Sequence, residues 1–493
     1  MRYVGALDQG TTSTRFMIFD ENGAIVSSDQ KEHRQILPQA GWVEHDANEI
    51  WERTQEVIRG ALKNAGITGS QLSAIGITNQ RETTVAWSRS SGQPLSHAIV
   101  WQDTRTTEIL NRLSEAEQNE VIRRTGLAIA PYFSASKMTW LLERSRAVNH
   151  EDLCLGTIDS WLIFKLTGKQ VHATDVTNAS RTMLMDLETL DWHPELLKLF
   201  GVKKEMLPVI KASVSHFGQT DPSGPFGAAI PIAGVLGDQQ AAMFGQVCFE
   251  RGESKTTYGT GNFALLNTGS EIVRSKHGLL TTLCYQFEGR EPIYALEGSV
   301  AVTGSAVQWL RDQLQIIEKS SDIESLAASV PDNGGLYFVP AFSGLFAPYW
   351  RSDARGAIVG MTRASTKAHI ARATLEAICY QTRDVLDAMS KDSGVSLREM
   401  KVDGGITVNA LCMQMQSDIM QIDISRPVIN ETTALGAAYA AGLAVGIWTN
   451  QEVLKAKWKE SARFKPDKGS LLATDGYLSW QKAISRTLDW VEK

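Results

Sequence analysis

Two short segments rich in glycine and hydroxyl residues could hold a phosphate group. Their members are Gly10, Thr11, Thr12 and Ser13 in the first segment and Gly259, Thr260 and Gly261 in the second. Glycine lets a backbone approach an oxyanion closely, and successive N–H groups form a concavity that binds anions. The sequence has no GxxxxGK[ST] motif, and no GxGxxG opens a helix after a strand. Taken singly, each segment is better explained as a structural turn.

Two charged residues flank the first segment. Asp8 precedes it, and a carboxylate there could hold Mg²⁺ directly or through water, as phosphoryl transfer requires. Arg15 follows it and could add charge-assisted donors to a phosphate.

A second group of residues suits a ligand rich in hydroxyls. Arg81 and Glu82 lie in the run ITNQRETT, directly after a predicted buried strand at 73–78. Ligands of α/β proteins bind at such strand ends, and a guanidinium beside a carboxylate supplies both donors and acceptors to vicinal hydroxyls. From this run alone, an ion pair on the surface is the better explanation.

A third candidate is the carboxylate of Asp238. It follows an apolar run and a glycine in GVLGDQQAAMFG and opens a predicted helix of small residues. Aspartate at a helix start is usually an N-cap. It could instead act as a general base that takes a hydroxyl proton during attack on a γ-phosphate.

The elements around these residues alternate between strands and helices, which indicates an α/β protein. Short apolar runs at 3–7 and 16–19 predict two strands that join through the first glycine-rich turn. The apolar spacing in 49–65 and 369–389 predicts helices, and the small residues of 435–446 predict a closely packed helix.

Residues 254–268 repeat the arrangement of the N-terminus, with a Gly/Thr turn between two strand-like stretches. The repeat suggests two structurally related halves that join near 246–254. Coincidence is the alternative, because Gly/Thr hairpins are common.

Composition narrows the class of protein. A length of 493 residues predicts two or three domains, and 43% hydrophobic with 21% charged residues is typical of globular proteins. A net charge of -6 without a basic run argues against a nucleic acid partner. The five cysteines have no metal-ligand spacing, and no signal peptide or membrane-spanning run occurs, so we expect a cytoplasmic protein without membrane insertion.

These motifs resemble those of the FGGY carbohydrate kinases, which belong to the actin-like ATPase superfamily. The phosphate and adenosine motifs of that family are similar to DQGTTSTR, GDQQ, YGTG and VDGG of this chain. Within the family, its glycerol kinase branch is similar in the blocks GWVEHD, ITNQRET, PYFSASK, TNASRTM, GDQQAA, TYGTG and FSGLFAPYW.

The resemblance implies an α/β fold of two actin-like (ribonuclease H-like) domains, each a mixed β-sheet flanked by helices. The active site would lie in the cleft between a domain at 1–248 and a domain at 249–493. It also implies ATP-dependent phosphorylation of glycerol to sn-glycerol 3-phosphate, the entry step of glycerol breakdown, in a homo-oligomer (a dimer or a tetramer).

The resemblance assigns roles to individual residues. The ATP site would comprise Thr11, Thr12, Ser13, Arg15, Thr260, Gly304, Gln308, Gly405 and Asn409. Glycerol would contact Arg81, Glu82, Trp101, Tyr132, Asp238, Gln239 and Phe263, with Asp238 as the base and Asp8 and Asp238 close to Mg²⁺. Plain core packing is the alternative for Trp101 and Phe263.

Two other functions compete with this one. A kinase of the same family for another polyol or a ketose would use the same ATP half, and an actin-like ATPase that binds a partner would share the phosphate turns. Residues 220–231 contain no Lys or Arg where some bacterial members carry a basic loop, which argues against feedback by a sugar bisphosphate.

Overall fold

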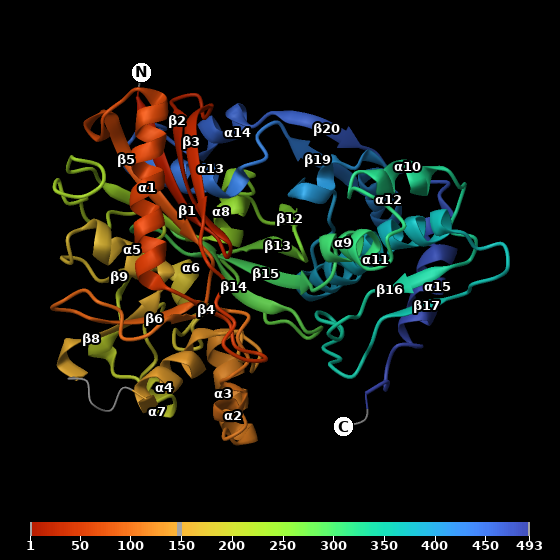
Figure 1. Cartoon of the computed structure of the whole chain (residues 1–493), viewed down its shortest axis with the longest axis horizontal. Coiled ribbons are helices and arrows are strands. Elements are labelled where there is room, and N and C mark those ends of the chain that lie inside the picture. The colour runs from red at the N-terminus through yellow and green to blue at the C-terminus, as the bar shows by residue number, and fades with distance from the viewer. Residues whose placement is uncertain (1, 145–149, 492–493) are drawn as a thin grey trace.

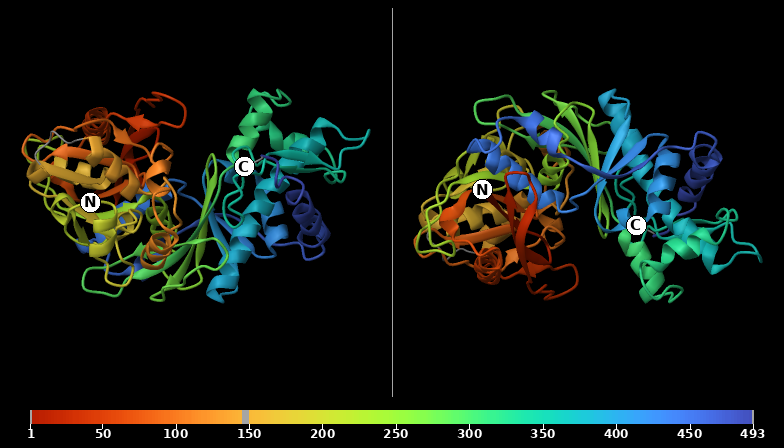
Figure 2. Two further views of the ribbon diagram at one scale, coloured as in Figure 1. Left: turned by 90° about the horizontal axis from the view of Figure 1, so that it is seen from below. Right: turned by 90° about the horizontal axis from the view of Figure 1, so that it is seen from above.

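The structure is a computed structural model that describes residues 2–144 and 150–491. It has two lobes that lie side by side, each built around one mixed β-sheet with helices against it (Figures 1 and 2). The helices are α1 (Ala47–Ala65), α2 (Thr107–Leu110), α3 (Glu115–Thr125), α4 (Ser134–Arg144), α5 (Ile158–Leu166), α6 (Val176–Ala179), α7 (Pro194–Leu199), α8 (Asp238–Gly245), α9 (Gly304–Asp312), α10 (Asp322–Ala328), α11 (Lys367–Ser393), α12 (Ala410–Met420), α13 (Thr432–Ala444), α14 (Gln451–Lys457) and α15 (Asp475–Ile484).

The first sheet has five strands. Their order across the sheet is β11 (Ile232–Gly237), β5 (Leu72–Asn79), β1 (Tyr3–Gln9), β2 (Ser13–Asp20) and β3 (Ile25–Glu32). Strands β1, β2 and β3 form an antiparallel meander, whereas β5 and β11 run parallel to β1. The strands predicted at the N-terminus and at 73–78 are confirmed, and so is the helix predicted at 49–65, which is α1.

The second sheet repeats this topology. Its order is β14 (Leu280–Tyr285), β15 (Ile293–Val300), β13 (Asn262–Gly269), β12 (Ser254–Tyr258), β18 (Glu399–Asp403), β19 (Asp423–Pro427) and β20 (Glu460–Phe464). Strands β12, β13 and β15 form the antiparallel meander, and β18 and β19 run parallel to β12. The two Gly/Thr turns therefore occupy equivalent places, β1–β2 and β12–β13, which confirms the predicted repeat.

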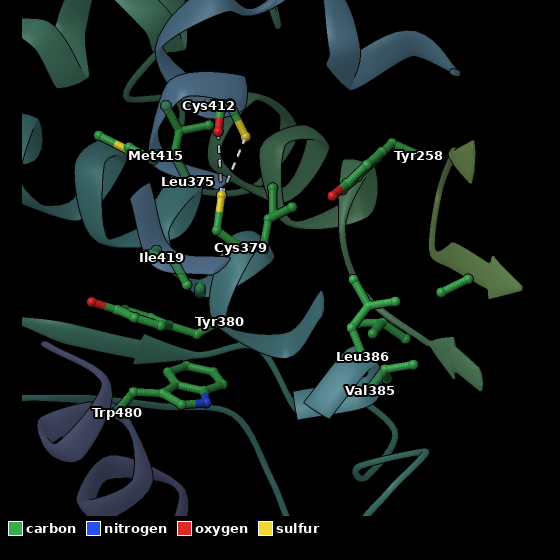
Figure 3. Packing of buried hydrophobic residues seen from close by; sticks show 14 of the residues in the cluster. Tyr258, Leu375, Cys379, Tyr380, Val385, Leu386, Cys412, Met415, Ile419 and Trp480 are labelled. Atoms are coloured by element: carbon green, nitrogen blue, oxygen red, sulfur yellow. Dashed lines mark hydrogen bonds between the residues drawn. The ribbon is translucent and has the colours of Figure 1, made fainter. Parts of the chain in front are cut away.

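The two faces of the second sheet differ in character because successive side chains alternate across a strand. One face contributes Ala264, Leu266 and Leu296 to a core against α11 and α12. Figure 3 shows this core, in which the rings of Tyr380 and Trp480 stack with centroids 5.6 Å apart.

The opposite face turns toward the first lobe and carries charge. Strand register places Lys255, Thr257 and Phe263 on this face together with Glu297 and Asp403. Lys255 and Glu297 are fully or almost fully buried there, at 0% and 1% exposed. This polar face lies between the lobes and supplies part of the candidate site described below.

Helix α13 crosses back to the first lobe, where it packs against α8 and strands β1, β5 and β11 (Figure 1). Small residues make this close packing possible. A side chain added at Gly436 would overlap the carbonyl oxygen of Ala241 in α8, and one at Gly76 in β5 would overlap that of Ala437 in α13. The small-residue helix predicted at 435–446 is thus confirmed, and it covers the sheet that bears the Gly/Thr turn between β1 and β2.

Three smaller sheets complete the lobes. They pair β4 (Glu44–His45), β7 (Ala98–Ile99), β6 (Thr84–Ser88) and β8 (Leu153–Thr157) in one sheet, β9 (Ala173–Asp175) with β10 (Val209–Lys211), and β16 (Tyr337–Val339) with β17 (Ala357–Val359). All five cysteines are buried free thiols. Within the described residues, no helix combines the length and the apolar character that crossing a membrane requires.

The packing of α13 yields a prediction for the variant Gly436→Ala. Overlap with Ala241 in α8 should destabilise the fold by about 1–3 kcal/mol, more than the helix propensity gained, which is at most about 1 kcal/mol. Thermal unfolding measures the difference. Gly469→Ala is the matched control, because its added Cβ would meet its nearest atom at 3.4 Å. Equal melting temperatures for the two variants would contradict the close approach of α13 and α8.

Candidate active site

The turn that follows strand β5 has a backbone conformation that is unusual for a residue other than glycine. Glu82 has a φ of 61° although it is not glycine, and the N–H of Thr83 donates to the carbonyl of Arg81 across this tight turn at 2.7 Å. A non-glycine residue in this region costs of order 1–3 kcal/mol and persists only where its surroundings enforce it. The turn directs two charged side chains into the protein interior, where Arg81 is 3% and Glu82 is 1% exposed. The surface ion pair considered from the sequence is therefore wrong.

Four buried charges form a closed ring at this point. Arg81 donates from Nη1 to Glu297 Oε2 at 2.5 Å and from Nη2 to Oε1 at 3.0 Å. Arg181 donates from Nη2 to Glu297 Oε1 at 3.0 Å and from Nε to Glu82 Oε1 at 2.7 Å. Arg81 Nε lies 3.9 Å from Glu82 Oε1, which closes the ring. Two positive and two negative charges thus neutralise one another.

The ring joins the two lobes. Glu297 stands on β15 of the second lobe, whereas Arg81, Glu82 and Arg181 belong to the first. The guanidinium groups hold the pKa of Glu297 at about 2, against the opposing effect of its burial. The buried carboxylate is therefore ionised at neutral pH and keeps both arginines in place.

Sequence reasoning missed two members of this ring, Glu297 and Arg181. Each left a signal. Glu297 interrupts the apolar strand IYALEGSV, and a charged residue inside such a strand needs a buried partner. Arg181 lies in the quoted block TNASRTM but received no role.

Asp238 lies beside the ring. Its Oδ1 is 3.2 Å from Arg81 Nε, and 32% of its side chain is exposed. Burial raises the pKa of Asp238, while Arg81, the N–H of Gln239 and Lys255 oppose the shift. The N-cap of α8 is Gly237, and Asp238 is the first helical residue, so the explanation of Asp238 as an N-cap is wrong. This leaves a carboxylate with access to solvent, fixed next to a guanidinium.

Gln239, on α8 of the first lobe, accepts a hydrogen bond from the second lobe. Lys255 Nζ, fully buried on β12, donates to Gln239 Oε1 at 2.6 Å and to Thr257 Oγ1 at 2.9 Å. Burial lowers the pKa of Lys255, and the nearby Asp403, Asp238 and Glu297 oppose that shift. The amide NH₂ of Gln239 keeps its donors for another partner.

The aromatic candidates divide into a pair and a single residue. Trp101 and Tyr132 pack edge to face with centroids 5.4 Å apart, and the guanidinium of Arg181 lies 6.0 Å from the Tyr132 ring. Both rings are half-buried, so the core-packing alternative does not fit Trp101. Phe263 is half-buried on the charged face of the second sheet, on the same face as Glu297.

Hydrogen bonds fix the Gly/Thr turn between β1 and β2, which is the first predicted phosphate turn. The N–H of Gly10 donates to Ser13 O at 2.9 Å, and Thr11 Oγ1 accepts from Trp101 Nε1 at 3.0 Å. Thr12 is exposed at the tip of the turn. Arg15 pairs with Glu431, which precedes α13, and donates to Gln30 at 3.0 Å.

The Gly/Thr turn between β12 and β13, which is the second predicted phosphate turn, is hydrogen-bonded to the start of α9. Gly304 donates its N–H to Gly259 O at 3.1 Å, and the carbonyl of Thr260 accepts from Thr303 and Ser305.

Three further residues were predicted to line the ATP site, and each lies in a different local structure. Gly405 follows Gly404, where a side chain would overlap the carbonyl of Tyr258 at the start of the β12–β13 turn. Gln308 is exposed on α9, and Asn409 caps α12 by accepting from Cys412 N at 2.8 Å.

Asp8 is the strongest candidate for a cation ligand. Burial raises its pKa to about 7, Arg15 opposes this shift, and the charges of Asp238 and Glu431 add to it. A cation would relieve this repulsion. Among the described residues, no group of three or more His, Cys, Asp or Glu side chains could hold a metal by itself. One or two carboxylates such as Asp8 and Asp238 suit Mg²⁺, which typically takes that number together with substrate phosphates.

Comparisons with known proteins identify the family. The model described as "FGGY family of carbohydrate kinases, N-terminal domain" matches residues 3–245, and that of the C-terminal domain matches residues 255–445. The chain belongs to the FGGY family of carbohydrate kinases. Its sequence is 60% identical to "Glycerol kinase" of Mycolicibacterium gilvum and to "Glycerol kinase 1" of Streptomyces coelicolor, over 99% of this chain and of each relative.

Two solved kinase structures share the fold of the whole chain. Glycerol kinase of Plasmodium falciparum with ADP superposes with a TM-score of 0.93 at 39% identity and covers 100% of this chain and 99% of its own. Gluconate kinase from Lactobacillus acidophilus gives a TM-score of 0.85 at 23% identity, covering 99% of this chain and 96% of its own. The predicted α/β fold of two related domains is therefore confirmed.

The charge ring predicts the effect of Glu297→Gln. Without this carboxylate, Arg81 and Arg181 share one buried carboxylate, Glu82, and the partly exposed Asp238 contacts Arg81. The undercompensated buried charge should cost about 3–5 kcal/mol of unfolding free energy. Chemical denaturation measures it. Glu56→Gln, which removes the half-exposed partner of Arg53, is the control and should cost less than about 1 kcal/mol. Equally small losses of unfolding free energy in both variants would contradict the role of Glu297 in neutralising Arg81 and Arg181.

The raised pKa of Asp8 predicts that the variant Asp8→Asn has a higher thermal stability than the wild type, by a margin that depends on pH. Folded Asp8 keeps its proton up to about pH 7, whereas the unfolded chain loses it near the ordinary value of 3.8. Rising pH therefore favours the unfolded state between these values and has no further effect above them. The melting temperature of Asp8→Asn should exceed that of the wild type by a margin that grows from pH 4 to pH 7. A margin independent of pH would contradict the shift.

Proposed function

We propose that this FGGY kinase transfers the γ-phosphoryl group of ATP to glycerol and releases sn-glycerol 3-phosphate and ADP. The observation that carries the proposal is the 58–60% identity, along 99% of this chain, to curated bacterial proteins named glycerol kinase. The site supports it, because a small neutral polyol needs paired donors and acceptors rather than a net charge.

Each polar side chain of the site has a task in this proposal. Arg81 and Glu82, fixed by the ring, present a donor and an acceptor to adjacent hydroxyls of glycerol, and Gln239 adds its free amide donors. Trp101, Tyr132 and Phe263 pack against the carbon chain. Because glycerol loses water on both its polar and its apolar sides, each of these contacts also excludes solvent from the reacting hydroxyl.

Asp238 acts as the general base. The reacting hydroxyl of glycerol donates its hydrogen bond to Asp238, and Arg81 and Lys255 favour the ionised form that can accept the proton. In phosphoryl transfer the transition state is loose, so the position of the base matters more than its basicity. The proton passes to Asp238 as the oxygen bonds to phosphorus and the β–γ bridging oxygen leaves with ADP.

The phosphates of ATP lie between the two glycine-rich turns. Thr11, Thr12 and Ser13 donate from the first lobe and Thr260 from the second, while Arg15 supports the first turn. Gly304, Gln308, Gly405 and Asn409 line the adenosine side. Asp8 and Asp238 would hold Mg²⁺, which neutralises phosphate charge and orients the γ-phosphoryl group.

Two alternatives are weaker. A kinase for another polyol or a ketose shares the fold, as the gluconate kinase at 23% identity shows, so the fold does not select the substrate. An actin-like ATPase that binds a partner would not require the buried ion pair between Arg81 and Glu297 or the buried hydrogen bond from Lys255 to Gln239. The homo-oligomeric state and the cytoplasmic location remain predictions.

A substrate panel tests the proposal. The purified protein with Mg²⁺ and ATP should release ADP in a coupled assay when glycerol is added, and should release much less with tetritols, pentuloses or gluconate. Sedimentation with and without ATP tests the actin-like ATPase alternative, since an ATPase that assembles into filaments would sediment with ATP. Equal rates with and without glycerol would overturn the proposal.

The base assignment predicts the behaviour of Asp238→Asn. General base catalysis contributes about 10²–10⁴-fold, so kcat should fall by that factor while calorimetry shows unchanged ATP binding. The control is Asp221→Asn, an aspartate outside the site that accepts from Ser223. A kcat of Asp238→Asn within threefold of the wild type, roughly 0.6 kcal/mol, would remove Asp238 from this role.

A further inference from the structure

A closed ring of hydrogen bonds links the first phosphate turn to the polyol side of the site. It runs through six residues: Thr11, Gln35, His45, Gln80, Thr83 and Trp101. Its bonds are 2.9–3.3 Å long. His45 belongs to the block GWVEHD, to which the proposed reaction assigns no role.

The bonds run from Trp101, which donates on both sides, to Thr11, which accepts on both sides. Trp101 Nε1 donates to Thr11 Oγ1, and its backbone N donates to Thr83 Oγ1, whose hydroxyl donates to Gln80 Oε1. Gln80 Nε2 then lies 3.3 Å from His45 Nδ1, and His45 Nε2 lies 2.9 Å from Gln35 Oε1. Since an amide oxygen only accepts, His45 donates from Nε2 and accepts at Nδ1.

This tautomer is the neutral imidazole, and its surroundings keep it neutral. His45 is 0% exposed, and burial lowers its pKa to about 3, with His33 adding to the shift. The ring of His33 packs edge to face on that of His45 with centroids 4.7 Å apart. The hydrogen-bond direction therefore does not change across the physiological pH range.

The amides of Gln35 and Gln80 reach both carbonyls at the base of the turn between β1 and β2. Gln35 Nε2 donates to Thr11 O at 2.9 Å. Gln80 Nε2 shares its two hydrogens among His45 Nδ1, Gly10 O at 3.1 Å and Gln9 Oε1 at 3.0 Å, and Gly10 O also accepts from Gln9 Nε2 at 2.8 Å. Within the turn itself, the N–H of Gly10 donates to Ser13 O at 2.9 Å. Thr11 Oγ1 already accepts from Trp101, so its own hydrogen is free to donate to an anionic oxygen.

We propose that His45 is a positioning residue for the nucleotide, which sets the Gly10–Thr11 turn through Gln35 and Gln80 and connects it to Trp101. The inference rests on the proposed function, since it assumes that the turn binds the phosphates of ATP. His45 touches neither substrate and acts through the two amides.

The test compares steady-state kinetics of the full-length protein with those of His45→Phe, which keeps the ring volume and removes both hydrogen bonds. The KM for Mg·ATP should rise about tenfold or more, the worth of one lost hydrogen bond, while the KM for glycerol changes less than about threefold. Gln35→Met removes the same link from an exposed position and should give the same selective rise. His45→Gln, which restores a donor toward Gln35, should recover part of the loss.

The matched control is His172→Phe. That imidazole is also neutral because burial lowers its pKa to about 3, and it makes one hydrogen bond, to Leu155 O at 3.1 Å, away from the site. It should lose stability without a change in either KM. An unchanged KM for Mg·ATP in both His45→Phe and Gln35→Met, or equal changes in both KM values, would overturn the inference. Absence of glycerol-dependent turnover in the wild type would instead overturn the proposed function.

Discussion

A buried charge must be neutralised where it lies, and this constraint governs how the two lobes meet. Arg81 and Arg181 are almost fully buried, and Glu82 is the one buried carboxylate that the first lobe places beside them, since Asp238 beside Arg81 is 32% exposed. The second carboxylate comes from Glu297 on the other sheet. The arrangement of Arg81 and Arg181 therefore depends on the second lobe, whose sheet also carries the Gly/Thr turn between β12 and β13.

The repeated sheet explains how one architecture serves both substrates. In each lobe the first two strands join through a Gly/Thr turn, and the parallel strands that follow deliver side chains next to it. In the first lobe β5 delivers Arg81 and Glu82, and β11 delivers Asp238. In the second lobe the charged face of β12 and β15 meets them. Helix α13, with its small residues, lets the first sheet and α8 lie close together beneath the site.

The sequence allowed much of this to be predicted, for identifiable reasons. Apolar periodicity located the strands at both Gly/Thr turns and the helices α1, α11 and α13, because these features depend on local pattern. Motif blocks predicted Arg81, Glu82 and Asp238 as site residues. Glu297 and Arg181 escaped, since their significance depends on partners 216 and 99 residues away, Arg81 and Glu82. The strained φ of Glu82 and the ring through His45 likewise arise only from tertiary contacts.

The central claim is that Glu297 and Arg181 act as one unit to shape the polyol site. The most direct test is calorimetric glycerol binding by the wild type, Glu297→Gln, Arg181→Gln and the double variant. The loss of glycerol-binding free energy in the double variant should be smaller than the sum of the losses in the two single variants, by about 1–3 kcal/mol. The reason is that the double variant leaves no unpaired buried charge. Additive losses would contradict the claim, and so would unchanged glycerol affinity in either single variant.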